Sequence, residues 1–323
     1  MRLLKSYLYQ HNLSKNKQIK FYNFWDQPYE ELWFYRFLVN RGLLQRYNKF
    51  NFHFFSVLGD SRLYFIDKFF YHKKNTKRIF FTGENVHYDV FKSYSSNFLD
   101  KKSIDISLGF DYLSNNKYLR FPIWLLELFP PESNMAEITR ICNLLSYQKY
   151  SCERVKFCAL VSGSSKWLGE DSLKFREKLF YDISKISQVD SAGSFLNNCD
   201  DLKLKFNDNK IEFLKQYKFF ICPENINING YVTEKVFHAI KSGCIPIYNG
   251  SDNSPEPKIL NKNAILFVNH TNNDNVYLLL DVLNNNANLY KDFFEQPRLL
   301  ANSPEIILDY FDEFENRIRN LID

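Results

Sequence analysis

This 323-residue chain lacks the residue patterns by which metal-dependent proteins are usually identified. It contains no Asp-x-Asp pair, and its six histidines stand apart from one another. None of the six cysteines forms a Cys-x-x-Cys pair; they are Cys142, Cys152, Cys158, Cys199, Cys222 and Cys244. Since structural and catalytic zinc sites depend on such closely spaced ligands, we expect no metal site here.

Long apolar runs are also missing. No run approaches the roughly 18 residues that a membrane-spanning helix needs, and residues 1–10 lack the apolar core of a signal peptide. Cys158, Cys222 and Cys244 lie within apolar segments, as reduced, buried thiols do. These features predict a cytoplasmic protein made in a reducing compartment.

The charge balance is only mildly basic. The chain has 42 Lys and Arg against 37 Asp and Glu, a net charge of +5 and a pI of about 8.7, with no dense basic stripe. Such a balance argues against a nucleic-acid partner. It suits an anionic ligand, and it also allows peripheral association with an anionic membrane surface.

Hydrophobic and aromatic residues are abundant. They include 32 Phe and 21 Tyr, and the 45% hydrophobic content is ample for two domain cores. Apolar runs typical of strands alternate with helical segments, most clearly in the second half; there we expect strands at 217–222, 245–248 and 264–268, and helices at 233–242 and 276–283. The pattern predicts an α/β protein with two Rossmann-like domains facing across a cleft.

A polar helical segment between residues 130 and 151 leads to the predicted domain boundary. We therefore expect an N-terminal domain at 1–150, a C-terminal domain at 151–303 and a final helix at 304–323 that packs back on the domains. The second domain opens with a strand at 155–161 that ends in the loop 162–165.

Two loops follow predicted buried strands. Arg78–Thr82 leads into Gly83-Glu84-Asn85, and Tyr217–Cys222 leads into a loop that ends at Thr233-Glu234-Lys235. Ligands of parallel sheets bind beyond the carboxyl ends of the strands, so both loops are candidate sites.

The second loop carries residue types that suit a nucleotide. Thr233 can cap the following helix and leave its N–H groups as an anion site. The carboxylate of Glu234 can accept the two hydroxyls of a ribose, and the ammonium of Lys235 can reach a diphosphate. A capped helix with an ordinary surface Glu–Lys pair is the alternative for these residues. For Glu84 the alternative is a turn residue that bonds nearby amides.

Three segments resemble the α1,3/α1,4-fucosyltransferase family, and they follow one another along the chain in the order that the family has. The most specific is Glu224-Asn225, followed by Gly230-Tyr231-Val232-Thr233-Glu234-Lys235 and then Pro246-Ile247-Tyr248. The others are the Thr-Gly-Glu-Asn segment at 82–85 and Tyr-Leu-Arg-Phe-Pro at 118–122. The likeness runs from about residue 21 to 250. It implies a GT-B fold, with an acceptor-binding N-terminal domain and a donor-binding C-terminal domain.

The resemblance also implies roles for particular residues. Glu84 matches the general base of the family. The predicted GDP-fucose-binding residues are Arg176, Asn225, Tyr231, Glu234 and Lys235. Pro223 and Asn249 depart from the family pattern, which often has Phe and Trp there. Both flank the donor loop and so bear on sugar specificity.

The predicted activity is an inverting transfer of L-fucose from GDP-fucose to a glycan hydroxyl, in α1,3 linkage to GlcNAc or Glc of N-acetyllactosamine-type acceptors. No cofactor or metal is expected, because Arg176, Lys235 and a helix N-terminus can stabilise the departing diphosphate. Two alternatives stay open: a GT-B transferase that uses another GDP-sugar, and an inactive glycan- or nucleotide-binding module. The sequence leaves the acceptor and the oligomeric state undetermined.

Overall fold

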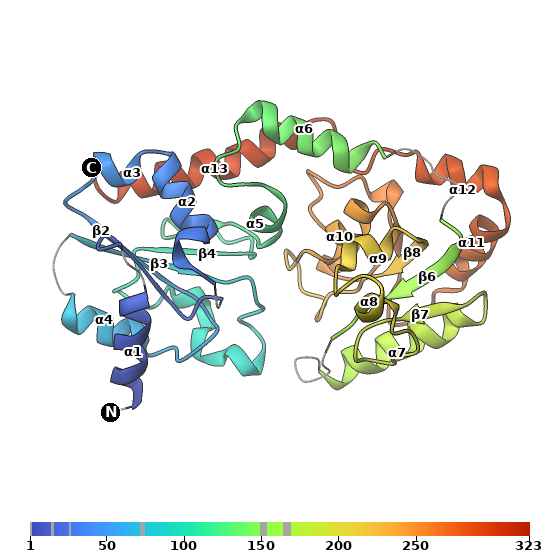
Figure 1. Ribbon diagram of the computed structural model, residues 1–323, viewed down its shortest axis with the longest axis horizontal. Helices are drawn as coiled ribbons and strands as arrows, with labels where there is room; N and C mark the ends of the chain where they lie inside the picture. The colour runs from blue at the N-terminus through green and yellow to red at the C-terminus, as the bar shows by residue number, and fades with distance from the viewer. Residues whose placement is uncertain (1, 14–15, 26, 72–74, 149–153, 164–168) are drawn as a thin grey trace. The chain divides into compact units, whose positions relative to one another are not determined.

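The chain folds into two compact units in the computed structural model (Figure 1). Unit 1 comprises residues 1–138 and 307–323, and unit 2 comprises residues 139–306. The structure describes residues 2–13, 16–25, 27–71, 75–148, 154–163 and 169–323. The sequence places the boundary at 150, whereas the units divide inside helix α6 (Met135–Ser146). Composition does not mark this division, since the helix continues through it.

Unit 1 contains a five-stranded, fully parallel sheet whose spatial order follows the chain. The strands are β1 (Ile19–Tyr22), β2 (Asn51–Phe55), β3 (Thr76–Phe81), β4 (Ile106–Gly109) and β5 (Tyr118–Arg120). Parallel strands that are buried on both faces read as nearly continuous apolar runs, and Asn51–Phe55 is an example.

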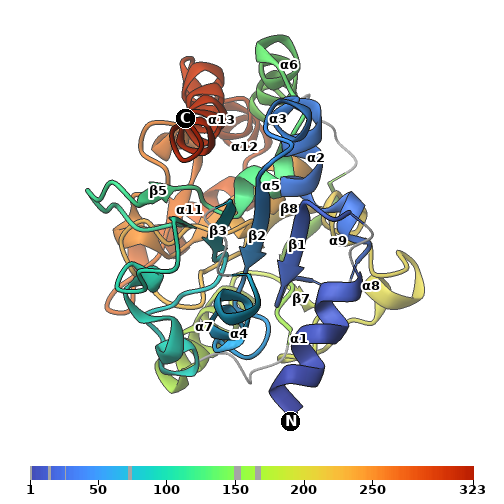
Figure 2. The same cartoon turned by 90° about the vertical axis from the view of Figure 1, so that its left-hand side faces the viewer.

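Successive strand residues face opposite helical layers in unit 1. The helices and 3-10 segments are α1 (Arg2–Leu13), η1 (Tyr29–Glu31), α2 (Trp33–Asn40), α3 (Leu43–Arg46), α4 (Leu63–Phe70), η2 (Asp89–Phe98) and α5 (Trp124–Leu128). Phe54 stacks on Phe34 of α2, whereas Phe55 joins a core cluster with residues of α1, α4 and η2. Figures 1 and 2 accordingly show α2 and α3 on one side of the sheet and α1 and α4 on the other.

The final helix, α13 (Ser303–Asn320), contributes its residues from Ile307 onward to unit 1. Its apolar positions 307, 311, 314 and 318 follow a helical period and are all fully buried. Phe311 meets the Trp33 ring edge-on at 5.2 Å, and Phe314 lies 5.1 Å from the Phe37 ring. The helix predicted at the C-terminus is therefore part of the unit 1 core.

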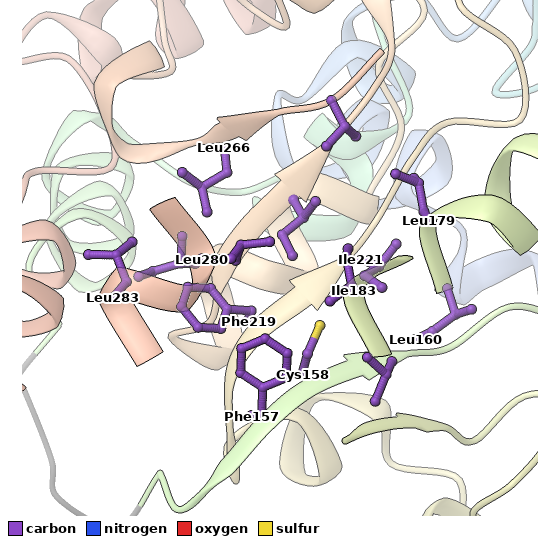
Figure 3. Packing of buried hydrophobic residues seen from close by; sticks show 14 of the residues in the cluster. Phe157, Cys158, Leu160, Leu179, Ile183, Phe219, Ile221, Leu266, Leu280 and Leu283 are labelled. Carbon is purple, nitrogen blue, oxygen red and sulfur yellow. The ribbon is translucent and has the colours of Figure 1, made fainter. Parts of the chain in front are cut away.

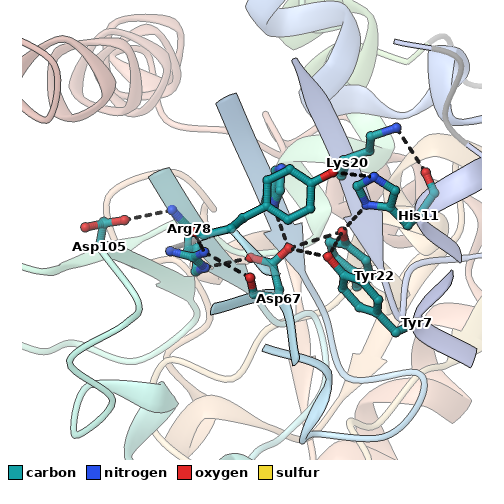
Figure 4. A network of polar contacts seen from close by, with 9 residues as sticks. Tyr7, His11, Lys20, Tyr22, Asp67, Arg78 and Asp105 are labelled. Atoms are coloured by element: carbon teal, nitrogen blue, oxygen red, sulfur yellow. Dashed lines mark hydrogen bonds and ion pairs between the residues drawn. The ribbon is translucent and has the colours of Figure 1, made fainter. Parts of the chain in front are cut away.

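A buried carboxylate joins α1 and α4 to the sheet (Figure 4). Asp67 of α4 accepts hydrogen bonds from Tyr7 of α1 at 3.0 Å, from Tyr22 of β1 at 3.2 Å and from Arg78 Nε of β3 at 2.7 Å. His53 Nδ1 lies 2.7 Å from the same carboxylate. Although burial alone would raise the pKa of Asp67, the neighbouring His53 and Arg78 lower it below its usual value.

Unit 2 also contains a parallel five-stranded sheet, in the order β10-β9-β8-β6-β7. Its strands are β6 (Lys156–Leu160), β7 (Val189–Ser191), β8 (Tyr217–Ile221), β9 (Ile245–Tyr248) and β10 (Leu266–Phe267). The helices are α7 (Glu170–Ser184), α8 (Asp201–Leu204), α9 (Lys210–Leu214), α10 (Lys235–Ser242), α11 (Asp274–Asn285) and α12 (Ala287–Phe294). Because the strand order reverses between β6 and β8, a topological switch point lies there.

The main core of unit 2 lies on one face of this sheet (Figure 3). Strand residues such as Cys158, Phe219 and Ile221 pack there with Leu179 of α7 and Leu280 of α11. The thiols of Cys158, Cys222 and Cys244 are buried, as the sequence predicts, and none of the three forms a disulfide; Cys152 lies outside the described residues. The predicted α/β architecture with two parallel-sheet units is confirmed.

Across the described residues, no helix combines the length and the apolar character that crossing a membrane requires.

A partly buried histidine, His11, lies beside the Asp67 network. His11 Nδ1 lies 2.7 Å from the Tyr22 hydroxyl and Nε2 lies 2.8 Å from the Tyr71 hydroxyl. Burial, with help from the Lys20 charge, lowers the pKa of His11 from 6.5 to about 4. His11 therefore becomes protonated below about pH 6.5 in the unfolded chain but only below about pH 4 in the folded chain.

We predict that the free energy of unfolding has its full value above about pH 6.5, with respect to His11, and decreases as the pH falls toward 4. His11→Gln should remove part of this decrease. Urea unfolding of both proteins at several pH values across this window measures the difference. Parallel pH profiles for the two proteins would contradict the role of His11.

Candidate functional site

The candidate site of unit 2 lies at the switch point of its sheet. Strands β6 and β8 pair in parallel there, and the chain leaves β6 toward α7 but leaves β8 toward α10. Loops that part in this way open a crevice at the carboxyl ends of the two strands, where ligands of such sheets bind. Ser162 follows β6, and Pro223 to Asn225 follow β8; Ser164 and Ser165 of the first loop lie outside the described residues.

Arg176 of α7 connects the two loops. Its Nη1 donates to Ser162 Oγ at 3.2 Å. Its Nη2 donates to the carbonyl oxygens of Pro223 and Glu224, at 2.8 and 3.0 Å, and to Asn225 Oδ1 at 3.2 Å. The Arg176 side chain is only 4% exposed, so α7 places a buried positive charge between the loops that follow β6 and β8.

The charge of Arg176 has no matching carboxylate at ion-pair distance within the described part of the chain. All its hydrogen-bond acceptors are neutral oxygens, and Nε has no partner there. Burial lowers the pKa of Arg176, although the more distant Glu224 acts in the opposite direction. A buried cation that is not neutralised is costly, and an anionic ligand would offset that cost.

Glu224 organises the rest of the site. Its carboxylate is 3% exposed and accepts hydrogen bonds from the Thr233 N–H at 2.8 Å, the Thr233 hydroxyl at 2.7 Å and Lys235 Nζ at 3.0 Å. The Tyr248 hydroxyl at the end of β9 donates to it at 3.3 Å. One side chain thus joins the β8 loop, the start of α10 and the end of β9. Sequence reasoning assigned no role to Glu224.

The predicted capping role of Thr233 is wrong. Helix α10 begins at Lys235, its N-cap is Glu234, and no side chain caps it. The Thr233 hydroxyl instead donates to Glu224 and accepts from Lys235 Nζ at 2.9 Å. The carboxylate of Glu224, nine residues earlier in the chain, binds this hydroxyl instead. A local sequence motif cannot reveal that contact. The predicted helix end is confirmed, since Gly243 takes a φ of +78° there.

Charged residues cluster around the start of α10. Burial alone would lower the pKa of Lys235, but the carboxylates of Glu224 and Glu234 raise it. Burial alone would raise the pKa of Glu234, but Lys235 and Lys210 lower it. Lys210, on α9, holds its Nζ 5.2 Å from the Phe220 ring centre, and burial lowers its pKa. This third cation was also missed, because α9 is remote in sequence from the motif.

The structure therefore brings Arg176, Asn225 and Lys235 together around the backbone and side chain of Glu224. Glu234 adjoins them as the N-cap of α10. Tyr231, the remaining predicted donor residue, is 1% exposed, and its ring is part of the interior of unit 2.

Glu84 lies in unit 1, on the loop that leaves β3. The Glu84 N–H donates to Thr82 Oγ1 at 3.1 Å, and the Thr82 hydroxyl donates to the Glu84 carbonyl oxygen at 2.7 Å. A Cβ at Gly83 would come within 2.3 Å of Ile123 Cδ1 and 3.0 Å of Ile123 Cβ, so any larger residue there would have to displace the Ile123 side chain. These contacts fix the backbone at Glu84, whose side chain is half-buried.

No group of three or more His, Cys, Asp or Glu side chains suited to holding a metal ion occurs among the described residues.

Two family models match most of the chain. Residues 19–127 match the α-(1,3)-fucosyltransferase FucT N-terminal domain, and residues 153–302 match the C-terminal part of glycosyltransferase family 10 (fucosyltransferase). The matches correspond closely to the sheets of unit 1 and unit 2. Helix α1 lies before the first matched residue.

Curated relatives share segments of the chain. The α-(1,3)-fucosyltransferase FucT of Helicobacter pylori is 32% identical over 246 residues, which are 69% of this chain and 48% of that protein. GDP-fucose protein O-fucosyltransferase 3 of Xenopus tropicalis is 28% identical over 158 residues, which are 47% of this chain and 33% of that protein. The chain thus spans half or less of the length of these relatives.

Solved structures resemble the whole chain. A crystal structure of an α1,3-fucosyltransferase matches with a TM-score of 0.60 and 22% identity, covering 96% of this chain and 95% of the other. An α1,3-fucosyltransferase crystallised with GDP-fucose matches with a TM-score of 0.57 and 23% identity, covering 97% and 95%. The fold is therefore of the GT-B type, as the sequence predicts.

We predict that Glu224→Gln destabilises unit 2. Gln keeps the size but removes the charge that Lys235 and Thr233 bind, and disrupting a buried ion pair typically costs about 3–5 kcal/mol. Glu212→Gln is the matched control, because Glu212 pairs with Lys215 on the surface and such pairs contribute at most about 1 kcal/mol. Thermal and urea unfolding compare the two variants; equal effects would contradict the central role of Glu224.

Proposed function

Since the chain belongs to glycosyltransferase family 10, the fucosyltransferases, we propose that it transfers L-fucose from GDP-fucose to a hydroxyl group of an acceptor glycan, with inversion at the anomeric carbon. The family models and the FucT relative of H. pylori support this activity. The α1,3 linkage to GlcNAc or Glc of an N-acetyllactosamine-type glycan is the finer part of the proposal.

The single observation that carries the proposal is the buried, unmatched charge of Arg176 at the switch point of unit 2. A diphosphate is the anion that such a position suits, because the guanidinium is fixed by hydrogen bonds before the ligand arrives. The other donor-binding residues in the proposal, Asn225, Tyr231, Glu234 and Lys235, lie on or beside the same loop.

In the proposed reaction the acceptor oxygen forms a bond to the anomeric carbon of fucose, and the bond from that carbon to GDP breaks. Glu84 takes the proton of the acceptor hydroxyl as a general base. The electron pair of the broken bond leaves with GDP, whose added negative charge is stabilised by Arg176 and Lys235. Lys210 contributes a further positive charge near the start of α10.

The proposal includes no metal ion. Fixed cations perform the task that a metal performs in other transferases, which is to stabilise the leaving diphosphate. Release of GDP in excess EDTA is the direct check, since activity that disappears with EDTA and returns with a divalent metal would overturn this part.

The deciding experiment measures GDP release from GDP-fucose with a panel of acceptors. N-acetyllactosamine-type glycans test the α1,3 linkage, and protein acceptors are included because one of the relatives is a protein O-fucosyltransferase. GDP-mannose in place of GDP-fucose tests the alternative of another GDP-sugar. GDP binding without release from any donor would support the other alternative, an inactive binding module.

Lys235→Ala should weaken the binding of GDP alone by about 10- to 150-fold, because a charge-assisted contact contributes about 1.5–3 kcal/mol. Lys241→Ala is the matched control, since Lys241 is exposed on the last turn of the same helix. Calorimetric titration with GDP needs no acceptor. Unchanged affinity in a folded Lys235 variant would remove this residue from the donor site.

Glu84→Gln should separate binding from catalysis. Gln keeps the size and hydrogen-bonding capacity but cannot accept the proton, so we expect near-normal GDP-fucose affinity and a decrease in kcat of about 10²- to 10⁴-fold. Donor titration and turnover at saturating acceptor give the two values. Equal losses in both would place Glu84 at the nucleotide instead, and full turnover would assign the base to another residue.

A further inference from the structure

Helices α1 and α4 of unit 1 expose an unusual concentration of large apolar side chains. On the two turns of α4, Phe65, Phe69 and Phe70 are 57%, 78% and 48% exposed. On α1, Leu4 and Leu8 are 39% and 45% exposed and stand one helical turn apart. We call these five side chains the α1–α4 face. An apolar surface of this kind on a folded protein usually marks a binding surface.

The side chains of this face are exposed although both helices are already packed. Tyr7, on the buried side of α1, donates to Asp67 on the buried side of α4 (Figure 4). The Tyr7 ring also stacks on Phe70 with ring centres 5.9 Å apart. The buried sides of the two helices are therefore packed in the core of unit 1, and Phe70, half-exposed beside Tyr7, links the exposed apolar side chains of α4 to α1.

Every exposed charge on the two helices is positive. Arg2 and Lys5 lie on α1, which contains no acidic residue. On α4 the exposed charge is Lys68, and the only acidic side chain is Asp67, which is fully buried and paired with Arg78. Apolar side chains surrounded by cations suit a surface that is both apolar and anionic.

From these observations we propose that the α1–α4 face binds the surface of an anionic lipid bilayer. The phenylalanine and leucine side chains enter the boundary between headgroups and acyl chains, while Arg2, Lys5 and Lys68 contact lipid phosphates. A second copy of the chain fits less well, because a symmetric contact would bring these cations against their own copies. The proposal does not depend on the proposed transferase activity.

The test is sedimentation of the purified chain with vesicles, with all lipid-free controls run in parallel. Vesicles of equal parts phosphatidylglycerol and phosphatidylcholine should bind the protein, and pure phosphatidylcholine vesicles should bind it more weakly. Phe65→Ser with Phe69→Ser should reduce binding by about tenfold or more, because two large apolar side chains no longer leave water. Lys5→Glu with Lys68→Glu should abolish the preference for phosphatidylglycerol.

The matched control replaces two exposed apolar residues of unit 2, Val155→Ser with Leu204→Ser; these side chains are 81% and 77% exposed. This variant should bind vesicles as the unchanged protein does. Absence of vesicle binding by the unchanged protein, or an equal loss in the control, would overturn the proposal. Self-association without lipid that the phenylalanine variant abolishes would also overturn it and assign the face to a second copy. Circular dichroism verifies that each variant is folded.

Discussion

The buried carboxylate of Glu224 is the contact on which the site of unit 2 depends. A carboxylate that is removed from water must be surrounded by donors, and here they come from Thr233, Lys235 and Tyr248, which follow it by 9, 11 and 24 residues. Satisfying one side chain thus fixes the shape of the β8 loop, the start of α10 and the end of β9. Arg176 then anchors this assembly to α7 through the carbonyl oxygen of the same residue.

This arrangement leaves positive charge in excess beside the loop. Lys235 is paired with Glu224, but Arg176 is bound only by neutral oxygens, and burial lowers the pKa of Lys210. Burying cations of this kind destabilises the folded protein unless an anion binds beside them. The site therefore favours binding of an anion. In the proposed reaction these fixed charges would need no rearrangement as the diphosphate leaves, which is the property that electrostatic stabilisation of a leaving group requires.

The sequence predicted the parts of the fold that depend on local patterns. Strand β9 was predicted at its observed bounds, α11 within two residues of its own and α13 within three, as is usual for strongly periodic segments. Helix α1 and strand β7 were not predicted, because α1 is apolar on its outer face as well and β7 has only three residues. Glu224, Lys210 and the role of Thr233 were missed or misassigned because their partners come together only through the folding of the sheet.

Burial also distinguishes the two glutamates that follow strands in the two units. Glu224 is almost fully buried and binds three donor residues, so its charge is committed to holding the loop. Glu84 is only half-buried, while the backbone that carries it is fixed through Thr82 and the close approach of Gly83 to Ile123. A general base needs a side chain that substrate can reach, so the half-buried Glu84, and not the buried Glu224, is the carboxylate to which we assign this role in the proposed reaction.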